Sequence, residues 1–483
     1  MKNINKVVIL GGGTAGWLTA AYLSKVLKNC EIALVDKENS TPVGVGEGTL
    51  LNFEPFLQQC GFDFNDWFDE VGATYKKGIL FKNWKQQGRD IWHPFLINPH
   101  IELHNNSLVS LHDCYSQCQE LDFKSNFTAF YNHIDNNFVD LNYKHGYHID
   151  CGKLVKFLKN RITSRENFNL ILSEVKHVNS QNGKVSGLTL INGHYVSADL
   201  FIDCTGFGRV LNQDRSCIVD LSDDLFCDTA IAAHIPYANT EKEMTPYVTS
   251  EACDIGWIWS IPVRDRIGSG IVFNRNITPI DEAAEHLCKY WQHRVTKDNL
   301  TTINWNPYYD SKMLKGNVVN IGLSAGFIEP LESTGVALIM EGIYQLSQRI
   351  SDLNYNTLDK DIFNLSMTSF FQESVDFVKM HYYQNERTSD FWKYVDQNYK
   401  MSNKHRHYLH TLATMHTVPI LDKKTNFFTA NNWVVWLIQM DAFLNKVDIS
   451  TDNINECLDL WRANQTSSLE QSVSHTQAIT LRN

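Results

Sequence analysis

The stretch Lys6-Val-Val-Ile-Leu-Gly11-Gly-Gly-Thr-Ala-Gly16-Trp17 decides the fold of this chain. A short apolar run leads into a Gly-x-Gly-x-x-Gly loop, residues 17–27 carry helical apolar spacing, and residues 31–35 have the composition of a second strand. Asp36 follows directly, at a spacing where a carboxylate accepts hydrogen bonds from a ribose diol. The stretch therefore predicts a β-α-β unit of a Rossmann-like α/β fold that binds a dinucleotide.

Two glycines of this loop have separate physical roles. Gly13 lets the backbone approach a pyrophosphate, whose charge lies at the helix N-terminus, and Gly16 lets the helix pack closely on the strand. The motif alone is weak in a chain with 26 glycines, but the strand, helix and acid around it support the prediction. No second glycine fingerprint follows a strand, so we expect no site for a nicotinamide cofactor.

Size and composition indicate a globular protein. The chain has 483 residues, 43% of them hydrophobic, so it can bury a large core in one big domain or two closely joined ones. A net charge of -11 without any basic run argues against nucleic-acid or anionic-membrane binding and favours a small-molecule substrate. Neither a signal peptide nor an apolar segment of membrane-spanning length is visible, so we expect a cytoplasmic protein.

The eleven cysteines indicate thiols rather than a metal centre. Cys114 and Cys118 are the nearest neighbours, about one helical turn apart, but no His or Cys pair at ligand spacing accompanies them. We expect reduced, buried, structural thiols and no metal site.

Five further segments carry a family resemblance when they are taken together with the glycine loop. They are Val43-Gly-Val-Gly46-Glu47-Gly-Thr49, residues 198–206, Trp257-Ile-Trp259-Ser-Ile261-Pro262, residues 316–324, and Phe327-Ile-Glu-Pro-Leu-Glu332-Ser333-Thr334-Gly335. Each segment is ordinary alone, since a Pro-Leu-Glu-Ser-Thr-Gly run, for example, is usually a turn that caps a helix. In this order they resemble the flavin-dependent halogenases of the tryptophan-halogenase family, clearly over residues 5–345 and loosely beyond.

The resemblance implies the domain organisation. Residues 1–345 would form an FAD-binding module of flavin monooxygenase type, with a β-sheet substrate region interleaved at about 80–145 and 225–310. Residues 346–483 would form a helical C-terminal lobe that completes the substrate site.

Apolar spacing supports helices in that lobe, for example at Ile454, Cys457, Leu458 and Trp461. The polar residues after about 464 lack this periodicity, and we expect a tail without regular structure there.

The resemblance also implies which residues hold FAD. The glycine loop and Asp36 would bind its dinucleotide part, and the second glycine-rich segment would lie along the isoalloxazine and couple the flavin to the substrate site. The implied FAD-binding residues are Gly11, Gly12, Gly13, Thr14, Ala15, Gly16, Asp36, Val43, Val45, Gly46, Glu47, Gly48, Val175, Leu323 and Val336.

The catalytic lysine of the family matches Lys76, in a register fixed by Thr74 before it and by Asn83-Trp84 after it. The resemblance implies that reduced FAD, oxygen and halide yield hypohalous acid, which must be held and aimed at the substrate. The ammonium of Lys76 would hydrogen-bond this oxidant, or its free amine would become a haloamine, and the sequence does not choose between these routes. A lysine of no special role is the ordinary alternative.

The segment ending at Gly335 would supply the remaining catalytic groups. Glu332 would come to the same pocket, support the developing cation and help to remove the ring proton. Its ordinary alternative is a first-turn glutamate favoured by the helix dipole. The backbone N–H groups of Thr334 and Gly335 would form a halide site, since an anion binds well at a helix start.

Aromatic residues would separate flavin from substrate and hold the substrate ring. Trp257 and Trp259 alternate along a strand and would face one side of it, keeping the organic substrate away from the flavin. The implied substrate contacts are His93, Phe95, Ser333 and Trp433. As isolated patterns, the two tryptophans are more often core packing, and a lone histidine is more often a structural residue.

Two departures from the family patterns bear on function. Leu323 stands where flavin hydroxylases have Asp after their last flavin strand, a departure that halogenases share. Residues 420–433 lack the Tyr pair and Glu with which free-tryptophan halogenases grip the amino acid's ends. We therefore expect electrophilic halogenation of an indole-like or phenol substrate without a zwitterion.

The predicted enzyme needs FAD, chloride or bromide, and a separate NAD(P)H-dependent flavin reductase that delivers diffusible reduced FAD. A flavin-dependent aromatic hydroxylase and a non-catalytic flavoprotein that binds an aromatic ligand are the alternatives. The halide, the ring carbon that reacts, and whether the chain forms a homodimer stay open.

Overall fold

The computed structural model describes residues 4–37, 46–95, 100–104, 108–110, 137–351, 357–414, 427–440 and 450–481. Contacts along the chain group it into two compact units. Unit 1 comprises residues 1–73, 149–225 and 305–372, and unit 2 comprises residues 74–148, 226–304 and 373–483. Each unit is therefore assembled from separated segments of the sequence. The predicted division into residues 1–345 and 346–483 is a different partition and stays a prediction.

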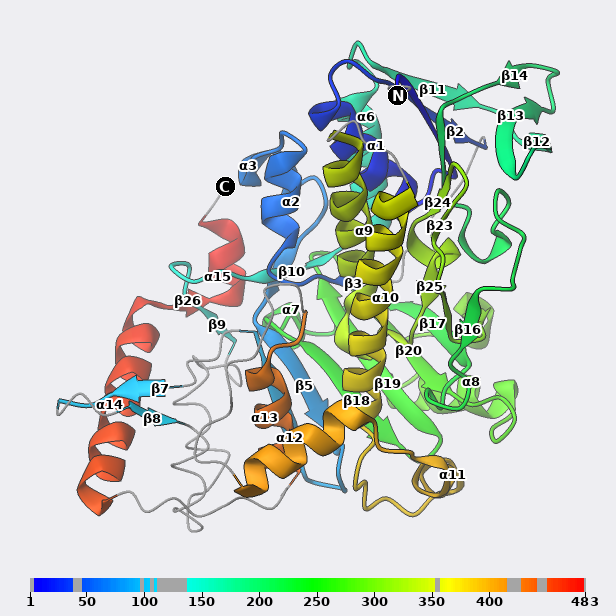
Figure 1. Ribbon diagram of the computed structural model, residues 1–483. Helices are drawn as coiled ribbons and strands as arrows, with labels where there is room; N and C mark the ends of the chain where they lie inside the picture. The colour runs from blue at the N-terminus through cyan, green and yellow to red at the C-terminus, as the bar shows by residue number, and fades with distance from the viewer. Residues whose placement is uncertain are drawn as a thin grey trace. The chain divides into compact units, whose positions relative to one another are not determined.

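Unit 1 is built on a six-stranded sheet that contains the predicted β-α-β unit (Figure 1). Its strands, in spatial order, are β11 (Phe168–Leu172), β2 (Glu31–Asp36), β1 (Lys6–Leu10), β15 (Leu200–Asp203), β24 (Val318–Asn320) and β23 (Leu314–Lys315). All neighbours pair in parallel except β23 and β24. The predicted strands at residues 6–10 and 31–35 are confirmed, and residues 198–206 contain β15 and the turn that follows it.

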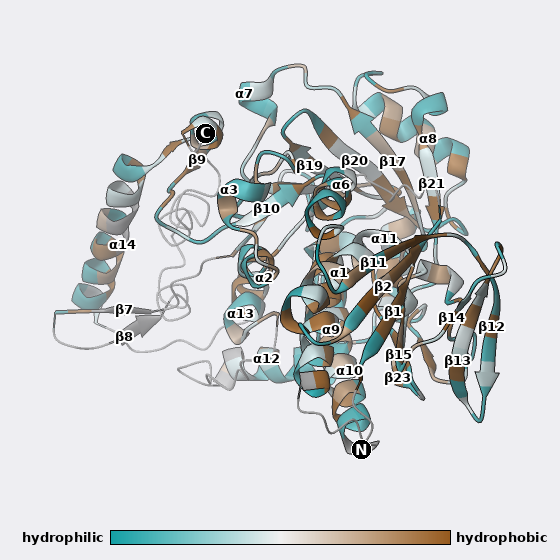
Figure 2. Cartoon of the chain, turned by 90° about the horizontal axis from the view of Figure 1, so that it is seen from above, coloured by the Kyte–Doolittle hydropathy of each residue, from teal (hydrophilic) through white to brown (hydrophobic). Residues whose placement is uncertain are grey.

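The central strands are apolar because both faces of a parallel sheet are covered. Val8 pairs with Ala33 on one side and Phe201 on the other, and all three are buried. The ribbons of β1 and β2 are correspondingly brown in Figure 2.

Unit 1 also contains several helices, of which the first packs on β1 and β2. They include α1 (Thr14–Val26), α2 (Phe53–Gln59), α3 (Phe64–Trp67), α6 (Cys151–Ile162) and α9 (Thr334–Ser351). The first helix packs against α2, α6 and α9. It begins three residues earlier than predicted because Gly13, with extended backbone, is its N-cap.

Two small sheets complete unit 1. One joins β12 (Val175–Gln181), β13 (Lys184–Leu190) and β14 (Tyr195–Val196), and the other joins β16 (Ile218–Asp220), β22 (Tyr308–Asp310) and β25 (Gly326–Phe327). Buried Arg209 fixes the second sheet to the loop after β24, because its guanidinium pairs with Asp310 at 2.6 Å and donates to the carbonyl of Ser324.

Unit 2 is built on a seven-stranded sheet. Its strands, in spatial order, are β21 (Thr301–Asn304), β17 (Thr229–Ile235), β20 (Arg266–Phe273), β19 (Gly256–Val263), β18 (Val248–Cys253), β5 (Gly78–Lys82) and β6 (Ile91–Pro94). All neighbours are antiparallel except β18 and β5.

Apolar residues of β17, β19 and β20 form a core with α8 (Ile280–Tyr290). The short helix α7 (Thr240–Glu243) lies between β17 and β18 in sequence.

Short strands and helices complete unit 2. The strand pairs are β4 (Thr74–Lys76) with β10 (Gly146–Ile149), β7 (His100–Glu102) with β8 (Leu108–Ser110), and β9 (Phe138–Val139) with β26 (Val473–Ser474). The helices are α11 (Asp390–Asn398), α12 (Asn403–Thr414), α13 (Ala430–Gln439), α14 (Thr451–Gln471) and α15 (His475–Thr480), while α10 (Thr357–Met380) contains the boundary between the units.

The helical character expected beyond residue 346 is confirmed, but the expected irregular tail after residue 464 is wrong. Helix α14 continues to Gln471, and Ser474 begins α15 with a capping box. Contacts with distant residues stabilise this polar segment: Ser468 is 3.2 Å from the Asp140 carboxylate, and Val473 pairs with Val139. Within the described residues, no helix is both long and apolar enough to cross a membrane.

Candidate active site

The predicted FAD-binding residues of unit 1 lie mainly at one edge of the parallel sheet. Strands β1, β2, β15 and β24 all end there, at Leu10, Asp36, Asp203 and Asn320. This is the edge at which open α/β sheets bind ligands, since the loops after parallel strands meet there.

Close approach requires the glycines of the first loop. A Cβ added at Gly12 would lie 1.9 Å from the Asp36 carboxylate, and one at Gly16 would lie 1.8 Å from the carbonyl oxygen of Gly11. Gly11 itself has a φ of +109°, which L side chains rarely adopt. At Gly13 an added Cβ would meet nothing within 4 Å. Gly13 is also the N-cap of α1, and as a glycine it has no side chain that could cap the helix.

This geometry fits the pyrophosphate of FAD. The first turn of α1, which includes Thr14 and Ala15, has backbone N–H groups without an intrahelical partner. An anion at this end satisfies them and is favoured by the helix dipole.

The loop after β24 lies beside the same edge. Gly322 has a φ of +75°, and a Cβ there would come within 2.8 Å of the Ala15 side chain. The exposed side chain of Leu323 lies 4.0 Å from an added Cβ at Gly206, in the turn after β15.

The other predicted FAD residues are placed as follows. Val175 begins β12 shortly after Ser173, whose N–H donates to the carbonyl of Asp36 at 2.9 Å, so it is also near the sheet edge. Val336 is buried in α9. Gly46 has a φ of +87° and precedes the short strand β3 (Glu47–Gly48). Val43 and Val45 lie outside the described residues.

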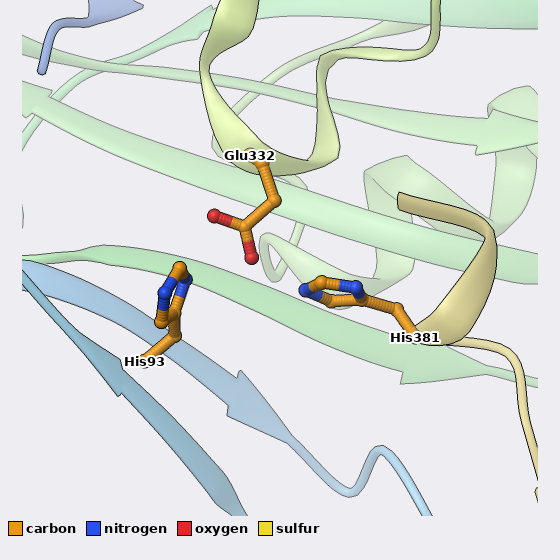
Figure 3. A group of neighbouring side chains, drawn as sticks. All are labelled: His93, Glu332 and His381. Carbon is orange, nitrogen blue, oxygen red and sulfur yellow. The ribbon is translucent and has the colours of Figure 1, made fainter. Parts of the chain in front are cut away.

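Glu332 ends a one-turn 3-10 helix, Pro330–Glu332, and its side chain is fully buried (Figure 3). Buried Ser333 has a left-handed φ of +59° and turns the chain into α9. That helix starts at Thr334, and a Cβ at Gly335 would meet nothing within 4 Å. The first N–H groups of α9 therefore follow directly on a buried carboxylate.

Lys76 of unit 2 is fully buried at the end of β4. Its ammonium lies 4.7 Å from the centre of the Phe95 ring, within the range of a cation–π interaction. The N–H of Phe95 donates to the carbonyl of Lys77 at 2.9 Å, which fixes the ring beside this strand. A buried ammonium of this kind is unusual, because lysine is mostly a surface residue.

Two histidines hold the strand that carries Lys76. His148 on β10 contacts the Thr74 hydroxyl through Nδ1 at 2.8 Å. His475 accepts the N–H of Tyr75 at Nε2, at 3.0 Å, and its Nδ1 donates to the carbonyl of Met244 at 2.8 Å. Burial lowers the pKa of His475 to about 4, with the charge of Lys77 adding to the effect. The low pKa keeps the ring neutral, the only form in which Nε2 accepts the N–H of Tyr75 while Nδ1 donates to Met244.

Trp257 and Trp259 occupy one face of β19, as predicted, with ring centres 6.3 Å apart. Gly270 pairs with Trp259 on the neighbouring strand, and a Cβ there would lie 2.0 Å from the indole. Trp84 packs against Trp257 at 6.4 Å and donates to the carbonyl of His381 at 2.7 Å. The two tryptophans that were predicted to separate flavin from substrate thus belong to a packed aromatic layer inside unit 2.

His93 is buried on β6 and contacts the Asn432 amide through Nε2 at 2.9 Å. Thr429 donates twice to the Asn432 oxygen, so the amide nitrogen faces the ring and donates to it. His93 consequently carries its proton on Nδ1 when neutral. The ring of His381 lies 6.5 Å from that of His93, nearly perpendicular to it (Figure 3).

Trp433 is fully buried in α13 and stacks on Tyr408, with ring centres 5.1 Å apart. It also contacts Phe377 at 5.4 Å, and His93 contacts the same ring at 5.3 Å. The two predicted substrate residues therefore share one aromatic neighbour.

Comparison with known proteins identifies this arrangement. The sequence model of the tryptophan halogenases matches residues 6–456. The chain belongs to the tryptophan halogenase family. It is 30% identical to the tryptophan 6-halogenase ThaL of Streptomyces albogriseolus, with 81% of this chain and 79% of that protein covered. It is also 30% identical to the tryptophan 7-halogenase RebH of Lentzea aerocolonigenes, with 81% and 78% covered.

Solved structures agree. The flavin-dependent halogenase Xcc4156 of Xanthomonas campestris superposes with a TM-score of 0.90 at 25% identity, covering 100% of this chain and 99% of that one. The halogenase BrvH of Brevundimonas sp. BAL3 gives 0.88 at 25% identity, with 99% of each chain covered. The protein is thus a flavin-dependent halogenase, and the predicted Rossmann-type fold is confirmed. FAD and halide are used by this family, whose members generally rely on a separate flavin reductase.

Several residues that contact the predicted site residues, or the strand that carries Lys76, have no local signal in the sequence. The need for a glycine at residue 270 could not be predicted, because it depends on the indole of Trp259, its partner on the neighbouring strand. His148, His381 and His475 were isolated histidines in the sequence, and their significance depends on long-range contacts. The predicted absence of a metal site stays a prediction, as do the individual roles of the site residues.

Proposed function

We propose that this halogenase transfers chlorine or bromine to an electron-rich, indole-like aromatic by electrophilic substitution, with Lys76 and Glu332 as catalytic residues. The observation that carries the proposal is the full burial of Lys76 beside the aromatic ring of Phe95. A buried ammonium against an aromatic face is expensive to maintain for structure alone, which favours a chemical role.

Lys76 would hold and aim the oxidant. Reduced FAD, when bound, supplies hypohalous acid from oxygen and halide. The ammonium of Lys76 would donate a hydrogen bond to this acid and make its halogen more electrophilic, or the free amine would take the halogen as a haloamine. Both routes stay open, and both require the nitrogen of Lys76.

Glu332 would act on the substrate ring. The new carbon–halogen bond leaves a cationic ring, and a buried carboxylate stabilises this charge and then accepts the ring proton. The N–H groups of Thr334 and Gly335 would bind the halide at the start of α9.

Aromatic residues would select the substrate. His93 and Phe95 would contact the indole, with Ser333 and Trp433 as further contacts, while Trp257 and Trp259 would keep the substrate away from the flavin. Because residues 420–433 lack the Tyr pair and Glu that grip an amino acid's ends, we propose bare indole or a substituted indole as substrate.

The reduced flavin would come from a separate NAD(P)H-dependent reductase by diffusion. A cytoplasmic location is retained as a prediction, and whether the chain forms a homodimer stays open.

The test is to incubate the enzyme with FAD, a flavin reductase, NADH, an indole panel and either chloride or bromide. Isotope-resolved mass spectrometry should detect a halogen pattern in the product. A product that gains one oxygen and no halogen would favour the hydroxylase alternative, and flavin turnover without any modified aromatic would contradict the proposal for this panel.

A further inference from the structure

The β4–β10 pair places His148 next to Lys76. Thr74 lies directly opposite His148 and Lys76 directly opposite Gly146. Opposed residues of an antiparallel pair share a face, and so do residues two apart on one strand. His148 and Lys76 are therefore diagonal neighbours on one face, within reach of a long side chain, and Gly146 has no side chain to occupy the space opposite the lysine.

The hydrogen bonds of Thr74 determine where His148 carries its proton. The single proton of the Thr74 hydroxyl is donated to the carbonyl oxygen of Pro262, at 2.6 Å. The hydroxyl must therefore accept at its 2.8 Å contact with His148, so Nδ1 of the imidazole is the donor. In the neutral ring, Nε2 then carries a lone pair and no proton.

That lone pair lacks a hydrogen bond. Nε2 of His148 is buried and has no hydrogen-bond partner among the described residues, although the side chain is completely inside unit 2. A buried acceptor without a donor is destabilising, so proteins rarely keep one without a purpose.

The charges that act on His148 come from Lys76 on β4 and His475 on α15. Burial has the largest effect on the pKa of His148 and lowers it well below its usual value, the charge of Lys76 lowers it further, and any proton on His475 would do the same. The ring is consequently neutral at physiological pH, the form in which Nε2 accepts hydrogen bonds.

We propose that His148 is a positioning residue for Lys76: in the working enzyme its Nε2, which has no direct partner among the described residues, accepts a hydrogen bond from the ammonium through one bridging water molecule. This inference rests on the proposed catalytic role of Lys76. Thr74 determines the tautomer of His148, and this tautomer leaves the lone pair of Nε2 available as an acceptor. The hydrogen bond to that lone pair would keep Nζ of Lys76 in position while it binds the oxidant. The Thr74 hydroxyl and the Pro262 carbonyl thereby act on the lysine through His148.

Two substitutions distinguish positioning from mere packing. The amide nitrogen of Asn reproduces Nδ1, so His148→Asn keeps the bond to Thr74 and loses the acceptor at the Nε2 position. The longer His148→Gln keeps an acceptor near the Nε2 position. A positioning role predicts that H148Q retains more halogenation than H148N, whereas a structural role of the Thr74 contact predicts the reverse order.

The first readout is independent of halogenation. Competitive acylation over a pH series, followed by peptide mass spectrometry, gives the midpoint at which Lys76 becomes nucleophilic. Loss of an acceptor destabilises the ammonium, so H148N should move this midpoint about one pH unit lower, while H148Q stays near wild type. Lys82, which pairs with Glu251 at 2.9 Å, is the internal reference and should not change.

The second readout is the halogenation rate with indole and bromide, which should fall about tenfold in H148N at unchanged FAD affinity. Equal midpoints and equal rates in the two variants would overturn the proposal. If Lys76→Ala still halogenates, the proposed role of Lys76 fails, whereas a shifted midpoint in H148N would still support the contact.

Should H148N not fold, the wild-type enzyme provides the test. Selective ¹⁵N-histidine labelling should show His148 protonated on Nδ1 and unprotonated on Nε2 at neutral pH. The opposite tautomer would overturn the proposal.

Discussion

His475 accepts a hydrogen bond from the backbone N–H of Tyr75, 3.0 Å away, although the two residues are 400 positions apart in the chain. Tyr75 immediately precedes Lys76, so α15 directly stabilises the strand that presents the proposed catalytic lysine.

Acid should destabilise the enzyme through His475. Its pKa is lowered to about 4 in the folded protein, against 6.5 for the free side chain, so between these values the unfolded chain binds the extra proton. The contribution of His475 to stability is complete above pH 6.5 and declines as the pH falls towards 4. At pH 5 the loss amounts to roughly 2 kcal/mol.

Denaturant titrations at pH 7.5 and pH 5 measure this loss. His475→Gln, which does not titrate there, should be less stable than wild type at pH 7.5 but should lose less on acidification. An equal pH dependence in both proteins would contradict the assignment.

Lys76→Ala should abolish halogenation while flavin oxidation and peroxide release continue, because the role proposed for the lysine begins only after the oxidant has left the flavin. Product formation and peroxide are measured in the same reaction. Lys77→Ala is the matched control, since the ammonium of Lys77 is bonded to the carbonyl of Phe138 at 2.9 Å. Halogenation by Lys76→Ala at a near wild-type rate would remove this lysine from the mechanism.

Glu332→Gln should lower turnover about a hundredfold or more with little change in FAD affinity, because the amide keeps the shape of the buried carboxylate but loses its charge and basicity. Steady-state kinetics and flavin titration separate the two effects. Glu341→Gln, further along α9, is the control and should stay active. If FAD binding is lost instead, Glu332 is structural.

Gly16→Ala and Gly13→Ala should fail in different ways. A Cβ at Gly16 would overlap the Gly11 carbonyl, so this variant should unfold more easily, by several kcal/mol. A Cβ at Gly13 meets no protein atom, so this variant should fold normally and bind FAD weakly. Thermal melts and flavin titrations compare them, and normal FAD affinity in Gly13→Ala would argue against close approach of the cofactor to that residue.

Bare indole should outcompete free L-tryptophan. A zwitterion that enters an aromatic site without partners loses hydration that nothing replaces, and about 1.4 kcal/mol already corresponds to tenfold in specificity. Competition at equal concentrations, analysed by product mass, measures the ratio. A clear preference for tryptophan would show that other residues grip its ammonium and carboxylate.

The sequence predicted the parts of the structure that local patterns determine. The β-α-β unit and the Trp257–Trp259 face follow from spacing within a few residues, because strand and helix periodicity act over that range. The roles of individual residues in FAD binding and catalysis were inferred from the family resemblance, and they remain predictions.

Features that depend on distant contacts were not predictable. The polar sequence after residue 464 has little helical periodicity, yet Asp140 and strand β9 hold it in regular structure. Likewise, no local pattern around His148 indicates that Thr74 and Pro262 determine its tautomer. The sequence therefore indicated the family and the FAD-binding fold, but it did not indicate which residues hold the strand of Lys76.

The bond between Tyr75 and His475 also has a consequence for biosynthesis. Chains emerge from the ribosome N-terminus first, so the strand with Lys76 is made 400 residues before its acceptor exists. During that interval the backbone of this strand lacks a bond on which its final position depends. A message truncated before codon 475 would therefore encode the glycine loop and the strand of Lys76 but not the residue that accepts the N–H of Tyr75.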